Sequence, residues 1–132
     1  MGNVETVQGI YEAFGRGDVP HILDQLAEDV TWDQHAPDRD IPWLTPREGR
    51  DDVAGFFDAL ASLEITRFEP YNFLEGGDTG AALIALEGTV NETGAKIADD
   101  AEVHLWTFGP DGKITDFKHI VDTHQHVEAV RG

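Results

Sequence analysis

Histidines are the side chains of this acidic chain most suited to proton transfer. Three of the six fall close together in the stretch FKHIVDTHQH at 117–126, namely His119, His124 and His126, and a fourth, His104, precedes them. Imidazole titrates near neutral pH and also ligates metal ions. The spacing alone therefore leaves open acid–base catalysis, a metal site and a solvent-exposed role.

The strands that would carry His104 and His119 are joined by the turn signal GPDG at 109–112. Glycine and aspartate in such a short connection predict an antiparallel hairpin. Counting back from the turn places His104 across from Lys118 or His119. A single bulge would pair the two histidines directly.

Strand alternation predicts which side chains accompany the two histidines, because every second side chain lies on the same face. His104 shares a face with Trp106, and His119 shares one with Phe117 and Val121. If both faces line one concavity, the two imidazoles lie in an aromatic pocket. His124 and His126 follow the end of the strand and are expected to be terminal and solvated.

The rest of the chain predicts the elements around this hairpin. Apolar residues at helical spacing indicate helices over 4–14, from Asp18 as N-cap to about residue 26, and from Asp51 or Asp52 as cap. A strand at 29–35 and a proline-rich loop at 36–49 separate the second helix from the third. Four strands, at 64–75, 80–92, 95–108 and 113–123, then form an antiparallel meander, and a short terminal helix can follow. This order predicts one α+β domain over residues 1–132.

Composition narrows the function classes. Nine basic residues against twenty-six acidic ones give a formal net charge of −17, which argues against binding nucleic acid or an anionic membrane surface. No long apolar run predicts a membrane span, and the first residues lack the pattern of a signal peptide. The chain has no cysteine. We therefore expect a cytoplasmic protein without thiol chemistry.

Four stretches carry a family resemblance: YEAFGRGD, LAEDVTWDQHAP, REGRDDVAGFFDAL and FGPDGKITDFKHIVDT. With the order of elements, they make the chain similar to the nuclear transport factor 2-like superfamily, and most similar to its SnoaL-like and ketosteroid-isomerase-like members. The resemblance implies a cone-shaped, curved antiparallel sheet, with three helices in the N-terminal half, enclosing a mostly apolar pocket. It also implies a homodimer that pairs through the sheet, where Val103, Leu105 and Ile120 offer apolar area.

The resemblance assigns positions in the pocket but does not name the reaction. His104 falls where ketosteroid isomerases carry an acidic oxyanion donor, and His119 where limonene-epoxide-hydrolase-like relatives carry a catalytic aspartate. Gln34 occupies the position of the isomerase general base and is expected on the same strand face as Trp32. A glutamine amide cannot act as that base. The position of the tyrosine that completes the oxyanion hole of the isomerases lies near Ile10, and Tyr11 is one residue away from it. An ordinary ketosteroid isomerase is therefore not expected.

We predict His119 as principal base, with His104 as its partner or oxyanion donor and Gln34 orienting a water or a substrate oxygen. The hypothesis is isomerisation, aldol-type cyclisation or water addition on a small hydrophobic carbonyl compound. Asp33, His35, Asp99 and Asp100 could supplement this trio at the rim. The predicted substrate-binding residues are Trp32, Trp106, Phe117, Val121, Phe57, Tyr11 and Trp43.

Three alternatives stay open at this point. Each histidine alone could equally be a hydrogen-bonded core residue. A metal site needs three or four converging ligands, and the HxH of His124 and His126 is a weak motif, so no metal and no cofactor are predicted. The chain could also be a non-catalytic ligand-binding or dimerisation domain.

Overall fold

The computed structural model describes residues 2–35 and 41–132. Its helices are α1 (Asn3–Gly15), α2 (Val19–Asp24), η1 (Pro42–Leu44), α3 (Arg50–Ala59), η2 (Leu60–Ser62) and α4 (Thr123–Arg131), of which η1 and η2 are short 3-10 helices. Its strands are β1 (Leu26–Trp32), β2 (Arg47–Glu48), β3 (Leu63–Gly76), β4 (Thr79–Val90), β5 (Lys96–Phe108) and β6 (Ile114–Ile120).

The strands form one sheet in the order β2-β1-β6-β5-β4-β3. The predicted meander of β3 to β6 is confirmed, since each strand pairs with the next in antiparallel fashion. The expected antiparallel sheet has one exception, because β1 pairs with β6 in parallel. A parallel neighbour needs a long crossover connection, and most of the chain lies between these two strands.

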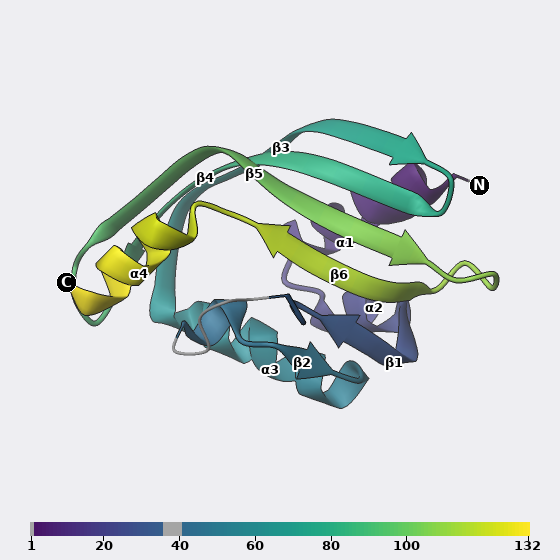
Figure 1. Ribbon diagram of the computed structural model, residues 1–132, viewed down its shortest axis with the longest axis horizontal. Helices are drawn as coiled ribbons and strands as arrows, with labels where there is room; N and C mark the ends of the chain where they lie inside the picture. Colours follow the sequence, from purple (N-terminus) through teal and green to yellow (C-terminus); the bar gives the residue numbers. More distant parts are fainter. Residues whose placement is uncertain (1, 36–40) are drawn as a thin grey trace.

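The helices cover one side of the sheet, which arches over α1, α2 and α3 (Figure 1). Sheet and helices bury one continuous apolar cluster that includes Val7 and Ile10 of α1, Val53 of α3 and Ile84 of β4. The predicted α+β class, a curved sheet with helices on one side, is confirmed. Across the described ranges, the helices are too short and too polar to cross a membrane.

The predicted start of the second helix is confirmed, because the Asp18 carboxylate accepts a hydrogen bond from the backbone N–H of His21 at 3.2 Å. The predicted cap of the third helix is wrong. Gly49 precedes α3 with a φ of 87°, a conformation that glycine adopts readily. The carboxylate of Asp52 instead accepts from the backbone N–H of Glu48 at 2.9 Å.

The predicted loop at 36–49 contains more structure than its prolines suggest. Its residues 36–40 lie outside the described residues, and the remainder holds η1 and β2. Gly49 ends this segment, and its backbone N–H donates to Val30 of β1 at 2.7 Å. The segment thereby brings Trp43 and Leu44 into the core.

The terminal helix α4 packs against the sheet. The side chain of Gln125 bonds both backbone groups of Ala98 on β5, donating to the carbonyl at 3.0 Å and accepting from the N–H at 2.5 Å. Thr93 donates its hydroxyl to the carbonyl of Ala129 at 2.7 Å. These contacts fix α4 at one end of the enclosed space.

Candidate functional site

The two histidines of the last hairpin lie directly opposite each other. His104 of β5 pairs with His119 of β6, and the register shifts between Thr107 and Phe108. The prediction that one bulge would pair them is confirmed. Their rings meet edge to face, with centroids 4.8 Å apart, and do not hydrogen-bond to each other.

His119 is held by a buried carboxylate. Its Nδ1 lies 2.6 Å from Oδ2 of Asp33, and its backbone N–H donates to Oδ1 of the same side chain at 2.7 Å. Asp33 is 0% exposed. The ionised carboxylate only accepts, so Nδ1 carries a proton, and Nε2 is left with no partner among the described residues.

Asp33, and not Gln34, is the polar residue that the end of β1 places in the site. Asp33 adopts a φ of 56°, which is uncommon for a residue other than glycine, and strand alternation therefore stops at Trp32. Gln34 is exposed, and its Nε2 donates to the carbonyl of Arg47 at 2.7 Å. The expectation that Gln34 shares the face of Trp32 is wrong for this reason.

His104 belongs to a chain of hydrogen bonds that links β5 to α1. Its Nε2 lies 2.6 Å from Oε2 of Glu102, its Nδ1 lies 2.7 Å from the hydroxyl of Tyr11, and that hydroxyl accepts from Nε1 of Trp106 at 3.2 Å. Glu102 accepts as a carboxylate, so Nε2 of His104 carries the proton and Nδ1 accepts from Tyr11. The sequence places Tyr11 one residue away from the position of the oxyanion-hole tyrosine. In the structure its hydroxyl nevertheless bonds His104.

The two imidazoles have pKa values shifted in opposite directions. For both rings burial is the largest effect and lowers the pKa. At His119 the charge and hydrogen bond of Asp33 outweigh burial, so its pKa is raised. At His104 the effect of burial is larger than that of the hydrogen bond and charge of Glu102, so its pKa is lowered. The charge of His119 lowers this pKa further. The surroundings therefore stabilise the imidazolium form of His119 relative to that of His104.

Two further groups of the network are shifted as well. Burial raises the pKa of Tyr11, which keeps its hydroxyl protonated as a donor. Burial also raises the pKa of Glu102, but the hydrogen bond and charge of His104, with the charges of His119 and His126, outweigh it and lower the pKa overall. Glu102 is therefore a buried carboxylate.

These groups face a largely apolar cavity of about 80 Å³ between the sheet and the helices. Six of the predicted substrate-binding side chains line it, namely Trp32, Trp106, Phe117, Phe57, Tyr11 and Trp43. Val121 does not, because β6 ends at Ile120 and alternation ends with it. The cavity is small beside ligand pockets of roughly 300–1,000 Å³.

His126 contradicts the expectation that both terminal histidines are solvated. It is 1% exposed and lines the cavity, and its Nδ1 accepts from Nε1 of Trp43 at 2.9 Å. His124 is exposed, as predicted. The two differ because α4 packs one face against the sheet. That face carries His126 and Ala129, which are buried, and His124 lies on the opposite, exposed side of the helix.

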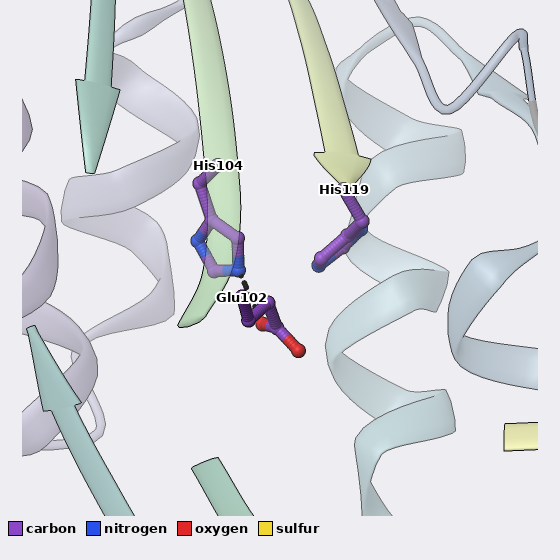
Figure 2. A group of neighbouring side chains, drawn as sticks. All are labelled: Glu102, His104 and His119. Carbon is purple, nitrogen blue, oxygen red and sulfur yellow. Dashed lines mark hydrogen bonds and ion pairs between the residues drawn. The ribbon is translucent and has the colours of Figure 1, made fainter. Parts of the chain in front are cut away.

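A cation would find three donor groups in the site. Single donor atoms of Glu102, His104 and His119 all lie within 4.8 Å of one another, and Figure 2 shows His104 and Glu102 bonded to each other with His119 facing them. Zinc bonds of about 2.0–2.2 Å require closer approach. The bond between Glu102 and His104 would also have to open, so the arrangement suits proton transfer better than metal binding.

Sequence reasoning missed two residues of the site, and each had a signal. Glu102 lies two positions before His104 on one strand, so alternation places it on the same face. His126 and Ala129 are spaced as one face of a helix, which indicates burial if that helix packs. For Asp33 the sequence predicts only a supplementary place at the rim of the pocket, whereas the structure buries it against His119.

Comparison with known proteins gives the family and the fold. A model of the SnoaL-like domain matches residues 7–117. A nuclear transport factor 2-like protein of unknown function from Burkholderia pseudomallei is 29% identical, with both chains covered completely and a TM-score of 0.81. A second such protein, from Burkholderia xenovorans, is 26% identical over 96% of this chain and 94% of its own, with a TM-score of 0.82.

A third solved structure was obtained in the presence of a small organic molecule. TerC, co-crystallised with polyporic acid, is 26% identical over 98% of each chain, with a TM-score of 0.81. No curated protein matches the sequence.

Proposed function

The chain belongs to the SnoaL-like domain family, and we propose that it is an acid–base enzyme acting on a small, neutral, largely apolar carbonyl compound, with His119 as general base. One observation carries the proposal. His119 is fixed at Nδ1 by the buried Asp33, while Nε2 has no partner within the described ranges and the side chain lines an apolar cavity. A histidine held only for structure would have no reason to leave that nitrogen free.

Asp33 prepares His119 for this role in two ways. It accepts the proton of Nδ1, so the lone pair of the neutral ring lies on Nε2, and it stabilises the imidazolium that forms when Nε2 takes a proton. Stabilisation of the imidazolium raises the pKa of His119 and makes the ring a stronger base. The buried charge of Glu102 acts in the same direction.

His104 serves as a fixed, neutral neighbour. Both of its nitrogens are hydrogen-bonded within the protein, so it has no free site for a ligand and its ring stays in contact with that of His119. Because its pKa is lowered, it does not compete for the positive charge. The hydrogen bonds of Glu102 and Tyr11 therefore support the site by fixing His104.

The reaction step follows from these groups. Nε2 of His119 takes a proton from the carbon next to the carbonyl, and the electron pair of that C–H bond moves to the oxygen, forming an enolate and an imidazolium. In an unsaturated ketone, return of the proton to another carbon of the conjugated enolate completes an isomerisation. Attack of the enolate carbon on a second carbonyl forms a C–C bond, and the resulting alkoxide takes the proton of the imidazolium, which completes a cyclisation. In a β-hydroxy ketone, the enolate electron pair forms a C=C bond while the hydroxyl leaves as water with the proton of the imidazolium, which completes a dehydration. All three share the first step.

The relative TerC supports a small organic ligand, since it was crystallised with polyporic acid at 26% identity to this chain. The aromatic lining of the cavity supports a ring-shaped or otherwise apolar body. Pairing of two copies through the sheet stays a prediction, with Val103 and Leu105 half-buried and Ile120 exposed on the outer strand face.

Exchange of hydrogen for deuterium tests the proposal without knowledge of the substrate. Small ring ketones are incubated with the protein in D₂O, and NMR follows the loss of protons next to the carbonyl. We expect the wild-type protein to accelerate exchange over buffer and His119→Asn to lose the acceleration. Equal exchange by both proteins, or none above buffer for any ketone, would contradict the proposal.

The second candidate is a non-catalytic ligand-binding domain, because an apolar, aromatic cavity can hold a ligand without reacting with it. It predicts a thermal shift with the same ketones but no exchange. Ligand binding raises the melting temperature by mass action whether or not chemistry follows, so the two measurements separate binding from turnover.

A further inference from the structure

The imidazole of His126 is a polar group in the cavity that the proposed proton abstraction does not use. Its Nδ1 lies 2.9 Å from Nε1 of Trp43. An indole N–H can only donate, so Nδ1 of His126 accepts and carries no proton. In the neutral ring the proton is therefore on Nε2, and the contact with Trp43 fixes this tautomer.

The Nε2–H of His126 is buried without a hydrogen-bond partner in the part of the chain that the structure describes. The side chain is 1% exposed, so water cannot simply replace a partner from outside. Buried donors without acceptors are rare, because each loses its bonds to water without gaining others. Trp32 carries a second such donor at Nε1, and both residues line the same cavity.

We propose that His126 is the hydrogen-bond donor for the carbonyl oxygen of the ligand, which spans the cavity between His119 and His126. The inference rests on the proposed function and adds the group that it lacks, a donor for the enolate oxygen. A fixed, buried N–H stabilises charge that develops on an oxygen during proton abstraction. His104 cannot supply this donor, since its own N–H is bonded to Glu102.

The surroundings of His126 also define the ligand class. Burial lowers the pKa of His126 and the charge of Glu102 offsets this only in part, so the ring is a neutral donor near pH 7. The buried carboxylates of Asp33 and Glu102 would repel a carboxylate ligand. The site therefore suits a neutral ketone whose oxygen lies toward α4 and whose acidic C–H lies toward His119.

A matched pair of probes tests the donor directly. Cyclohexanone and methylenecyclohexane have nearly the same shape, but only the ketone accepts a hydrogen bond. Each affinity is first corrected for the partition of that probe between water and octanol, because the alkene is the more hydrophobic of the two. On this corrected scale, titration calorimetry with wild-type protein should show the ketone preferred about tenfold, because it alone satisfies a buried donor. His126→Phe should remove this preference, and His126→Gln should keep much of it, because the glutamine amide nitrogen extends about as far as Nε2.

A measurement on the wild-type protein alone covers the case in which His126→Phe does not fold. In ¹H–¹⁵N spectra of the histidine rings, the Nε2–H signal of His126 should move on addition of cyclohexanone and stay in place with methylenecyclohexane. No preference in the wild type, an unmoved signal, or a preference retained by His126→Phe would each overturn the inference.

Failure of this inference and failure of the proposed function give different results. The preference for the ketone needs no turnover and should persist in His119→Asn. A protein that prefers the ketone but exchanges no protons keeps the donor role of His126 and refutes the general base. A protein that exchanges protons without preferring the ketone keeps His119 as general base and refutes the donor role of His126.

Discussion

Two pairs of a carboxylate and an imidazole lie side by side in this molecule, and they differ in what they leave free. The pair of Asp33 and His119 uses one ring nitrogen and leaves the other to the cavity. The pair of Glu102 and His104 has its ring bonded at both nitrogens, by Glu102 and by Tyr11. Both bonds to carboxylate are 2.6 Å long, so distance does not distinguish them.

The two pairs differ in whether a ring nitrogen is left without a hydrogen bond, and our proposal assigns proton transfer to the pair that leaves one free. His119 and His104 are both buried histidines next to a carboxylate, and their pKa values still move in opposite directions. We assign catalysis to the first pair and support of the site to the second. The following predictions test that division, beginning with the largest expected effect.

His119→Asn should reduce the rate of ketone proton exchange by about 10²- to 10⁴-fold, the range for loss of a general base. His104→Asn is the matched control on the facing strand. It should lose stability more than activity, because His104 exchanges no proton with the ligand. Exchange followed by NMR and urea unfolding measure the two effects, and a greater loss of exchange in the His104 variant would reverse the assignment.

Asp33→Asn should lower the exchange rate less, by about 10- to 100-fold, as loss of a partner that orients a functional histidine commonly does. It should also move the pH profile. His119 acts as a base when neutral, so activity falls as the pH drops below its pKa. The pKa is raised above 6.5 in the wild type, and without Asp33 burial lowers it, so the acidic limb should move to lower pH. If the acidic limb of the pH profile does not move in Asp33→Asn, titration of His119 is not the cause of that limb.

Glu102→Ala should destabilise the fold by about 1–3 kcal/mol, because it leaves the N–H of His104 buried without an acceptor. Urea unfolding at pH 7 measures this change. Glu102→Gln offers the control, since an amide oxygen can still accept from His104, and it should be destabilised less. Equal losses in both variants would show that charge, and not the hydrogen bond, is what Glu102 contributes.

Gln34→Ala should have the smallest effect, changing the exchange rate less than about twofold, the scale of exposed substitutions far from special features. Gln34 points away from the cavity and bonds the backbone of Arg47. A large loss of exchange in this variant would favour the role assigned to Gln34 from the sequence over the one that the structure gives to Asp33.

The fold was largely predictable because the signals that specify it are local. Strands alternate, turns carry glycine and aspartate, and the order of elements resembles one superfamily. The pairing of His104 with His119 followed from counting back from a single turn and allowing one bulge. The parallel contact of β1 with β6 did not follow, because no local pattern records which strand lies beside β1.

The sequence by itself determined that the two histidines lie on the facing arms of one aromatic hairpin and limited the partner of His104 to Lys118 or His119, because strand periodicity and a short turn leave few other registers. Only the tertiary structure decided which polar groups join them. One left-handed residue, Asp33, turns a carboxylate inward and Gln34 outward. The packing of α4 buries His126 against Trp43. Both outcomes depend on where the chain stops being a strand or where a helix docks, and long-range packing fixes these points.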